Sequence, residues 1–189
     1  RHSFVQLPDD EYTPRLFDPR AGFNRVTFMD FATPIAEPIK KRYITRHRLI
    51  KKDPSSALSE AVEPIVYYLD PGTPEPVKSA LLEGGNWWNQ AFEAAGFKNA
   101  FRVEIAPQGM DFLDVRYNVI QWVHRSTRGW SYGASVRDPR TGEILKGHVS
   151  LGSLRVRRDY LIAQGLLQPF KEGSTADKRM LELAVARLK

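Results

Sequence analysis

Histidines are the side chains of this sequence that could bind a metal ion or move a proton near neutral pH. The four of them stand far apart, at His2, His47, His124 and His148, and none has a second histidine four residues away, as a helical zinc pair does. We interpret His47 and His124 as ordinary surface or sheet residues. His148 lies in a predicted strand from which it could contact a ligand, although an ordinary sheet position is favoured there too.

Neither the carboxylates nor the sequence motifs of this chain form a recognisable active site. Asp111 and Asp114 flank the start of a predicted strand, and we interpret them as turn and cap residues before catalytic ones. The sequence contains no G-x-S-x-G, no phosphate-binding loop, no dinucleotide-binding glycine pattern and no H-E-x-x-H.

Four tryptophans could form a platform for a carbohydrate or a peptide. Trp88 falls on the apolar stripe of a predicted helix and Trp122 falls in a predicted strand, so both are predicted to be core residues. Trp87 and Trp130 are left open between core and ligand contact.

The composition is typical of a globular protein. The chain has 189 residues, of which 42% are hydrophobic and 11% aromatic, which is enough for one domain or one domain plus part of another. The absence of cysteine excludes disulfides and cysteine-based zinc sites. No run of about 18 apolar residues predicts a membrane span.

The net charge of +6 raises the question of an anionic partner. Seven of the 28 Lys and Arg residues lie between Lys40 and Lys52, where they are interleaved with apolar residues such as Tyr43 and Ile50. That pattern indicates a strand with one solvated face better than a phosphate-binding helix, and no nucleic-acid motif accompanies it. We therefore predict no nucleic-acid partner.

We divide the chain at the polar segment around Pro54. Residues 1–52 form a β-rich segment with strands predicted at Arg25–Phe31 and Arg42–Ile50, and this segment is too short to bury a core alone. Residues 53–60 are the predicted linker. Residues 61–189 form the second domain.

The second domain is predicted to begin with the strand Ile65–Leu69 and a helix from Pro74, capped by Thr73, to about Ala95. Within this helix Gly84 and Gly85 indicate that another backbone approaches closely. Further strands are predicted at 101–105, 115–123, 132–136 and 144–151, and further helices at 153–164 and from about Thr175 onward.

This order of elements predicts the fold class. A strand–helix–strand start implies a right-handed crossover and a parallel pair, and the turn Asp138–Gly142 adds an antiparallel strand at an edge. We predict an α+β fold, with a mixed, mostly parallel sheet, a long backing helix and an antiparallel edge strand, preceded by the short β-rich segment.

Three segments resemble the first half of a metzincin-like zinc-dependent metalloprotease domain, from a bacterial family of large proteases long classed as of unknown function. They are Glu83–Phe97, Asp114–Trp122 and Asp138–Ile144, and the segment from Tyr12 to Leu49 resembles the tail of the domain that precedes the protease in that family. The likeness covers nearly the whole chain, and its motifs are structural rather than catalytic.

The resemblance implies how a substrate is bound. The strand Ile144–Leu151 would be the edge strand above the active-site cleft, to which an extended peptide can add as a further strand. The substrate-binding residues that follow are Gly147, His148, Val149, Ser150 and Leu151. The full-length protein would act on a peptide or protein substrate, in the periplasm or outside the cell.

The resemblance also implies a zinc cofactor in the full-length protein. The helix from Thr175 would carry H-E-x-x-H shortly after Lys189, with the histidines binding zinc and the Glu activating the zinc-bound water. We therefore expect a fragment that contains no catalytic residue, binds no zinc and is inactive. Such a fragment could associate with itself through its exposed truncated face.

The alternative function is a non-catalytic module. Such a module would use an exposed edge strand and exposed aromatic side chains to bind a peptide or a glycan.

Overall fold

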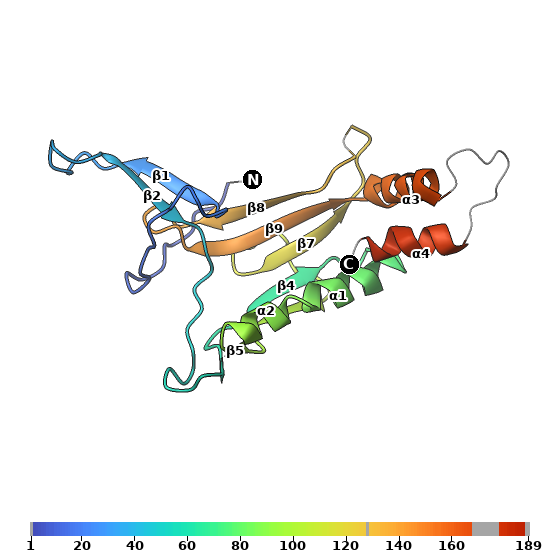
Figure 1. The fold of residues 1–189 in the computed structure, drawn as a ribbon, viewed down its shortest axis with the longest axis horizontal. Coiled ribbons are helices and arrows are strands. Elements are labelled where there is room, and N and C mark those ends of the chain that lie inside the picture. Colours follow the sequence, from blue (N-terminus) through green and yellow to red (C-terminus); the bar gives the residue numbers. More distant parts are fainter. Residues whose placement is uncertain (1, 128, 168–177, 188–189) are drawn as a thin grey trace. The chain divides into compact units, whose positions relative to one another are not determined.

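A computed structural model describes residues 2–127, 129–167 and 178–187 of the chain (Figure 1). The described part divides into two compact units: residues 1–48 with 135–147, and residues 49–134 with 148–189. The first unit therefore includes a segment that sequence analysis placed in the second domain. None of the described helices combines the length and the apolar composition that a membrane span requires.

The first unit contains the hairpin of β1 (Arg25–Met29) and β2 (Lys40–Ile44). The strands are antiparallel, with Arg25 opposite Ile44 and Met29 opposite Lys40. On the other side of β2, the Phe17 N–H donates to the Arg42 carbonyl at 3.0 Å, and the Ile44 N–H donates to the Arg15 carbonyl at 3.0 Å. Both predicted strands are confirmed, but each ends early, and the second ends at Ile44 rather than Ile50.

A five-stranded sheet has the order β6-β4-β7-β9-β8. The strands are β4 (Ile65–Leu69), β6 (Phe101–Ile105), β7 (Asn118–Val123), β8 (Tyr132–Arg137) and β9 (Ile144–Gly152). The pairs β4–β6, β4–β7 and β7–β9 are parallel. β8 runs in the opposite direction to β9, to which a short turn joins it (Figure 1). The predicted α+β class with a mixed, mostly parallel sheet is confirmed.

The identity of the antiparallel edge strand corrects a prediction. β9, which covers the predicted strand Ile144–Leu151, lies between β7 and β8 and is not an edge strand. The edge is β8. The turn Asp138–Gly142 predicts a hairpin, but either of its strands can face the rest of the sheet, and only the pairing of β9 with β7 decides the matter.

The helix predicted from Pro74 to Ala95 is two helices, α1 (Val77–Asn86) and α2 (Asn89–Ala94). α1 begins three residues late, and the predicted Thr73 cap is wrong: the Thr73 hydroxyl is buried and makes no hydrogen bond among the described residues. The interruption falls at Trp87 and Trp88. Trp88 is 65% exposed, so its predicted core position is also wrong.

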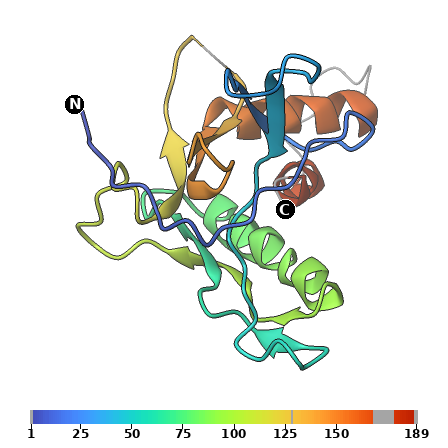
Figure 2. The same cartoon turned by 90° about the vertical axis from the view of Figure 1, so that its left-hand side faces the viewer.

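Helix α1 lies close to the sheet at Gly85. A Cβ atom added there would come within 2.6 Å of Val103 Cγ2 on β6. The neighbour at Gly85 is therefore a side chain, and the predicted close approach of another backbone is wrong at this position. Figure 2 shows α1 and α2 following each other along one face of the sheet.

Two further helices, α3 (Leu154–Leu167) and α4 (Lys178–Ala186), lie side by side in both views. They correspond to the last two predicted helices. The predicted start of the final helix at Ser174–Asp177 and the chain end at Lys189 lie outside the described residues. A short parallel pair, β3 (Ser59–Glu60) with β5 (Phe97–Lys98), completes the strands of the described part.

Candidate functional site

The five predicted substrate-binding residues lie on β9. His148 to Leu151 pair in parallel register with Val119 to Trp122 of β7. The His148 ring nitrogen Nε2 lies 3.2 Å from the Ser150 hydroxyl. Since β9 has a neighbour on each side, an extended peptide cannot add to it as a strand, and the geometric reason for choosing Gly147 to Leu151 is wrong. Their contact with substrate by side chains stays a prediction.

β8 lies at the edge of the five-stranded sheet, next to β9. The Asp138 N–H donates to the Glu143 carbonyl at 2.9 Å, so the backbone of Asp138 faces β9. Because backbone groups alternate in direction along a strand, those of Gly133, Ser135 and Arg137 point to the outer side of β8. A Cβ atom added at Gly133 would meet no atom within 4 Å. The face of the sheet toward which a side chain at Gly133 would point is therefore open at this position.

Exposed aromatic side chains lie at the start of β8. Trp130 is 54% exposed and Tyr132 is 45% exposed. The Arg125 guanidinium lies 5.1 Å from the centre of the Tyr132 ring and donates to the Trp130 carbonyl at 3.0 Å. These contacts hold the segment before β8 against the end of β7, and they leave apolar ring surface beside the open edge.

A histidine and a serine meet at the carboxyl ends of β7 and β9. His124 Nδ1 lies 2.8 Å from the Ser153 hydroxyl, and the Ser153 N–H donates to the Val123 carbonyl. Ligands of open sheets bind at this end of parallel strands. His124 is exposed, as predicted.

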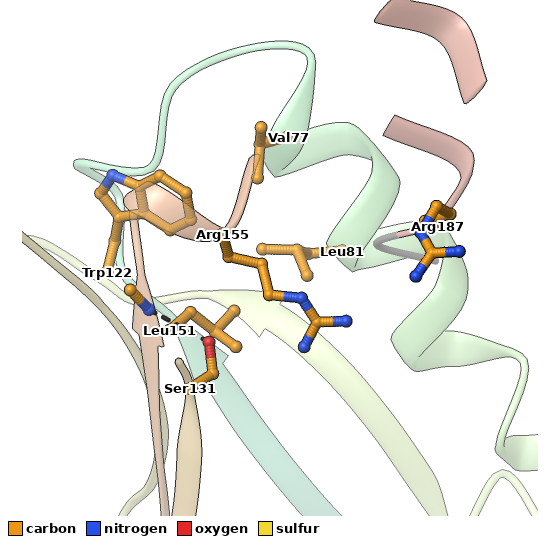
Figure 3. A pocket seen from close by; sticks show the side chains of 8 residues that line it. Val77, Leu81, Trp122, Ser131, Leu151, Arg155 and Arg187 are labelled. Atoms are coloured by element: carbon orange, nitrogen blue, oxygen red, sulfur yellow. Dashed lines mark hydrogen bonds between the residues drawn. The ribbon is translucent and has the colours of Figure 1, made fainter. Parts of the chain in front are cut away.

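A small cavity lies between α1 and the sheet (Figure 3). Its walls include Val77, Leu81, Trp122 and Leu151, and its volume is about 80 Å³. Ligand pockets are usually several hundred Å³, whereas one water molecule occupies roughly 30 Å³. The cavity therefore has room for a few waters and does not bind a substrate side chain of ordinary size.

Two arginines beside this cavity are held by a buried carboxylate. Asp159 of α3 is 1% exposed and accepts hydrogen bonds from Arg155 Nε at 3.2 Å and from Arg187 Nε at 3.3 Å. Because Arg187 follows α4, the pair ties α4 to α3. We interpret this cluster as structural.

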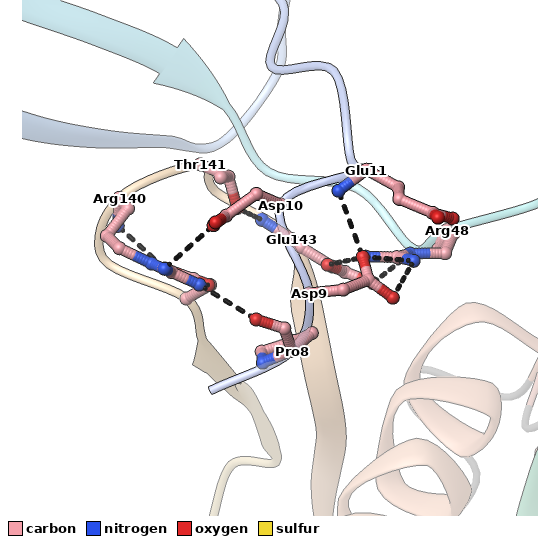
Figure 4. A network of polar contacts seen from close by, with 9 residues as sticks. Pro8, Asp9, Asp10, Glu11, Arg48, Arg140, Thr141 and Glu143 are labelled. Atoms are coloured by element: carbon pink, nitrogen blue, oxygen red, sulfur yellow. Dashed lines mark hydrogen bonds and ion pairs between the residues drawn. The ribbon is translucent and has the colours of Figure 1, made fainter. Parts of the chain in front are cut away.

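The turn after β8 is held by ion pairs within the first unit (Figure 4). Arg48 binds both carboxylate oxygens of Glu143, through Nε at 2.8 Å and through its terminal nitrogen at 2.9 Å. Arg48 also pairs with Asp9 at 2.9 Å. Arg140 pairs with the buried Asp138 at 2.8 Å. These bonds fix the residues that follow the open edge strand.

Burial and these ion pairs shift several pKa values. Burial lowers the pKa of His47 to about 4, so this ring is neutral at physiological pH. The hydrogen bond from Arg140 lowers the pKa of Asp138 below its usual range. The hydrogen bond to Glu143 raises the pKa of Arg48. Sequence analysis missed the partial burial of His47, because a lone histidine among basic residues carries no signal of burial.

The described residues do not fit a zinc ion. Among them, no group of three or more His, Cys, Asp or Glu side chains could hold a metal. His124 and His148 have serine partners in place of further ligands. Asp111 and Asp114 accept hydrogen bonds from the backbone of Leu113 and Arg116, which confirms their predicted role in turns.

Comparison with known proteins bears on the first segment. Residues 1–52 match a family described as Domain of unknown function (DUF5117). No curated protein and no solved structure matches the chain. The family match covers 52 of the 189 residues, so it does not extend to the five-stranded sheet.

Proposed function

We propose that this chain is the substrate-binding frame of a zinc-dependent peptidase, and that β8 is the strand to which an extended peptide adds. The observation that carries the proposal is the sheet order. Four parallel strands are followed by one antiparallel strand at the edge; the metzincin-like resemblance also implies an edge strand that binds substrate, although it places that strand at Ile144–Leu151.

Strand addition at β8 has a clear physical basis. An edge strand offers unpaired N–H and C=O groups at every second residue, and a peptide that pairs with them gains main-chain hydrogen bonds whatever its side chains are. The exposed rings of Trp130 and Tyr132 at the start of β8 add apolar contact area for alternate side chains.

The proposal assigns peptide binding, and no catalytic step, to the described residues. Since those residues do not fit zinc, the zinc ligands and the general base would have to come from residues outside them. The coding sequence that adjoins Lys189 tests this part. A H-E-x-x-H motif within about 20 residues, which as a helix would extend roughly 30 Å, is the expected result. Its absence there would contradict the peptidase assignment.

Hydrogen exchange during a peptide titration tests the binding site. The probe is a capped octapeptide of alternating threonine and glutamate, chosen because the protein carries a net charge of +6. We expect exchange at Gly133 and Ser135 to slow as the peptide is added. The amides of Tyr132 and Ala134, which face β9, serve as internal controls and should not change.

A proline substitution sharpens this test. Ser135→Pro removes an outward N–H, and proline is tolerated in edge strands on their solvent side. We expect this variant to lose peptide binding, whereas Ser135→Ala retains it. Equal binding by the two variants, with folding verified by circular dichroism, would show that the peptide does not pair with β8.

The second candidate function is a non-catalytic binding module, which the exposed Trp130 and Tyr132 favour. A module needs no further residues to bind its ligand. Tight binding of the octapeptide or of a glycan by this chain alone, without H-E-x-x-H in the adjoining sequence, would favour the module over the peptidase.

A further inference from the structure

The opposite edge of the sheet, β6, has backbone groups that face away from β4. The Ile65 N–H donates to the Ala100 carbonyl at 2.7 Å, and the Ala106 N–H donates to the Leu69 carbonyl at 2.9 Å. In a parallel ladder the residues that bond to the neighbouring strand alternate with residues that do not. The backbone groups of Phe101, Val103 and Ile105 therefore lie on the outer side of β6.

Two asparagine side chains occupy part of this outer side. Asn86 Oδ1 accepts from the Val103 N–H at 2.8 Å, and Asn86 Nδ2 donates to the Val103 carbonyl at 3.1 Å. Asn89 Oδ1 accepts from the Phe101 N–H at 3.3 Å. A side-chain amide has the same donor and acceptor as a peptide group, so Asn86 bonds to Val103 as a residue of a neighbouring strand would.

The asparagines can reach the edge because of the helix on which they lie. Asn86 ends α1 and Asn89 begins α2, and a separation of three residues places both on the same side of the chain. The approach of α1 to Val103 at Gly85 brings the two amides within hydrogen-bond distance of β6.

The sequence of β6 is complementary to itself. If a second copy of β6 paired antiparallel with the first and Val103 faced Val103, Arg102 would lie opposite Glu104 of the other copy, and Phe101 opposite Ile105. Arg102 and Glu104 form an ion pair with each other in the single chain, and their side chains are 49% and 44% accessible, so both charges can reach a second copy. Opposite charges on facing residues stabilise such a pair, and the contact has the twofold symmetry of a closed dimer.

There is also space beside the first residues of this edge. A groove of about 470 Å³ is lined by Asn86, Asn89, Phe101 and Arg102 among others. We propose that β6 is a self-complementary edge, and that Asn86 and Asn89 prevent it from pairing with β6 of a second copy of the chain. The inference concerns β6 and does not depend on peptide binding at β8.

Removal of the asparagines tests the proposal. Asn89→Ala frees one backbone group of the edge, Asn86→Ala frees two, and the double variant frees three. Alanine favours helix, so the helices that carry these residues should persist. We expect the dimerisation constant, measured by sedimentation equilibrium, to rise in that order and to be at least tenfold greater in the double variant than in the natural chain.

Asn118→Ala is the matched control. The Asn118 side chain also bonds to strand backbone, at the Val66 carbonyl, but at the interior pair β4–β7. This variant loses a comparable hydrogen bond and opens no edge, so its dimerisation constant should equal that of the natural chain.

A charge exchange tests the register of the dimer. In the double-alanine background, Arg102→Glu places two acidic residues opposite each other and should return the dimerisation constant to the natural value. Adding Glu104→Arg restores opposite charges and should restore the dimer.

Three outcomes would overturn the proposal. The first is a double variant that associates no more strongly than Asn118→Ala although hydrogen exchange at Phe101 and Val103 has become fast. The second is unchanged slow exchange at both amides, which would mean that the asparagines do not hold the edge. The third is a dimerisation constant that does not respond to the exchange of charges at Arg102 and Glu104, which would rule out pairing through β6.

Discussion

The two edges of the five-stranded sheet are treated differently. At β6, side-chain amides from Asn86 and Asn89 bond to the outer backbone groups. At β8, the backbone groups of Gly133, Ser135 and Arg137 point to the outer side of the sheet, where no further strand of the described residues pairs with them. Open edges are a hazard because they pair with any extended chain, and proteins keep them open where that pairing is useful. This contrast supports the proposal that a peptide adds to the sheet at β8.

The two edges are also held by different chemistry. Uncharged amides and close packing at Gly85 hold the region of β6. Ion pairs of Arg48, Glu143, Arg140 and Asp138 hold the turn that follows β8. The amide contacts at β6 carry no group that titrates near neutral pH. The ion pairs after β8 include Arg48, which follows the titratable His47 in the chain. Three variants test this difference.

The largest loss in free energy of unfolding is expected for Glu143→Ala, which removes the ion pair with Arg48 at the turn after β8. Glu143 is 6% exposed, and its loss leaves the partly buried Arg48 with Asp9 alone. Breaking a buried ion pair costs about 3 kcal/mol in free energy of unfolding at the low end of the usual range. Urea denaturation measures the loss.

Glu60→Ala is the control for this prediction. Glu60 pairs with Lys52 at 2.8 Å, but both side chains are more than half exposed. Its removal should change the free energy of unfolding by less than about 1 kcal/mol. Equal losses in the two variants would show that the contact between Arg48 and Glu143 contributes no more than a surface pair.

An intermediate loss in free energy of unfolding is expected for Gly85→Ala, which disturbs the packing of α1 against the edge strand β6. The added Cβ would lie 2.6 Å from a methyl group of Val103, so α1 must move away from β6. Overpacking of this kind costs about 2 kcal/mol. Hydrogen exchange at Val103 should become faster, because Asn86 moves with the helix.

Gly165→Ala is the control for this prediction, and it should change the free energy of unfolding in the opposite direction. Gly165 lies within α3, and a Cβ there would meet no atom within 4 Å. The free energy of unfolding should rise by about 0.5–1 kcal/mol, since alanine favours helix. A loss at Gly165 as large as the loss at Gly85 would contradict the packing explanation.

The smallest loss in free energy of unfolding is expected when the pH is lowered from 7 to 5.5. The pKa of His47 is about 4 in the folded chain and about 6.5 when unfolded, so the unfolded chain binds more protons between these values. Stability is therefore complete above pH 6.5 and falls as the pH decreases toward 4. Between pH 7 and 5.5 the free energy of unfolding should fall by about 1 kcal/mol.

The variant His47→Gln tests whether the imidazole of His47 causes this pH dependence. His47→Gln should remove most of this pH dependence in urea denaturation at pH 7 and 5.5. Exchange at Phe101 and Val103, corrected for its intrinsic pH dependence, should not change over this range in either protein. A pH dependence that survives in His47→Gln would exclude His47 as its source.

Much of the sheet was predictable from short-range pattern. The strand of consecutive apolar residues at 65–69 and the alternating strand at 101–105 were predicted with the bounds that the structure has. The break at Trp87 and Trp88 was not, because the three-and-four spacing of apolar residues continues through it. The buried side of α1 instead follows Val77, Ala80 and Gly84, two of which are small residues with little hydrophobic signal.

The candidate site was less predictable than the fold. A sequence marks a hairpin by its turn, but the order of strands depends on pairings between residues far apart in the chain. The family resemblance assigned substrate binding to the strand that is β9. In the structure β9 pairs with β7, so that β8 is the strand at the edge of the sheet. The edge-closing role of Asn86 and Asn89 carried no signal either, since asparagine is common in turns and at helix ends.

The sequence by itself determined most of the longer strands and helices, the α+β class, the turn Asp138–Gly142 and the absence of a cysteine-based site, because these depend on residues close together or on composition alone. Only the tertiary structure decided which strand is the open edge, which side chains bond to the other edge and which histidine is partly buried with a lowered pKa. Those properties arise from contacts between distant segments, whose free energy is not encoded in any local pattern.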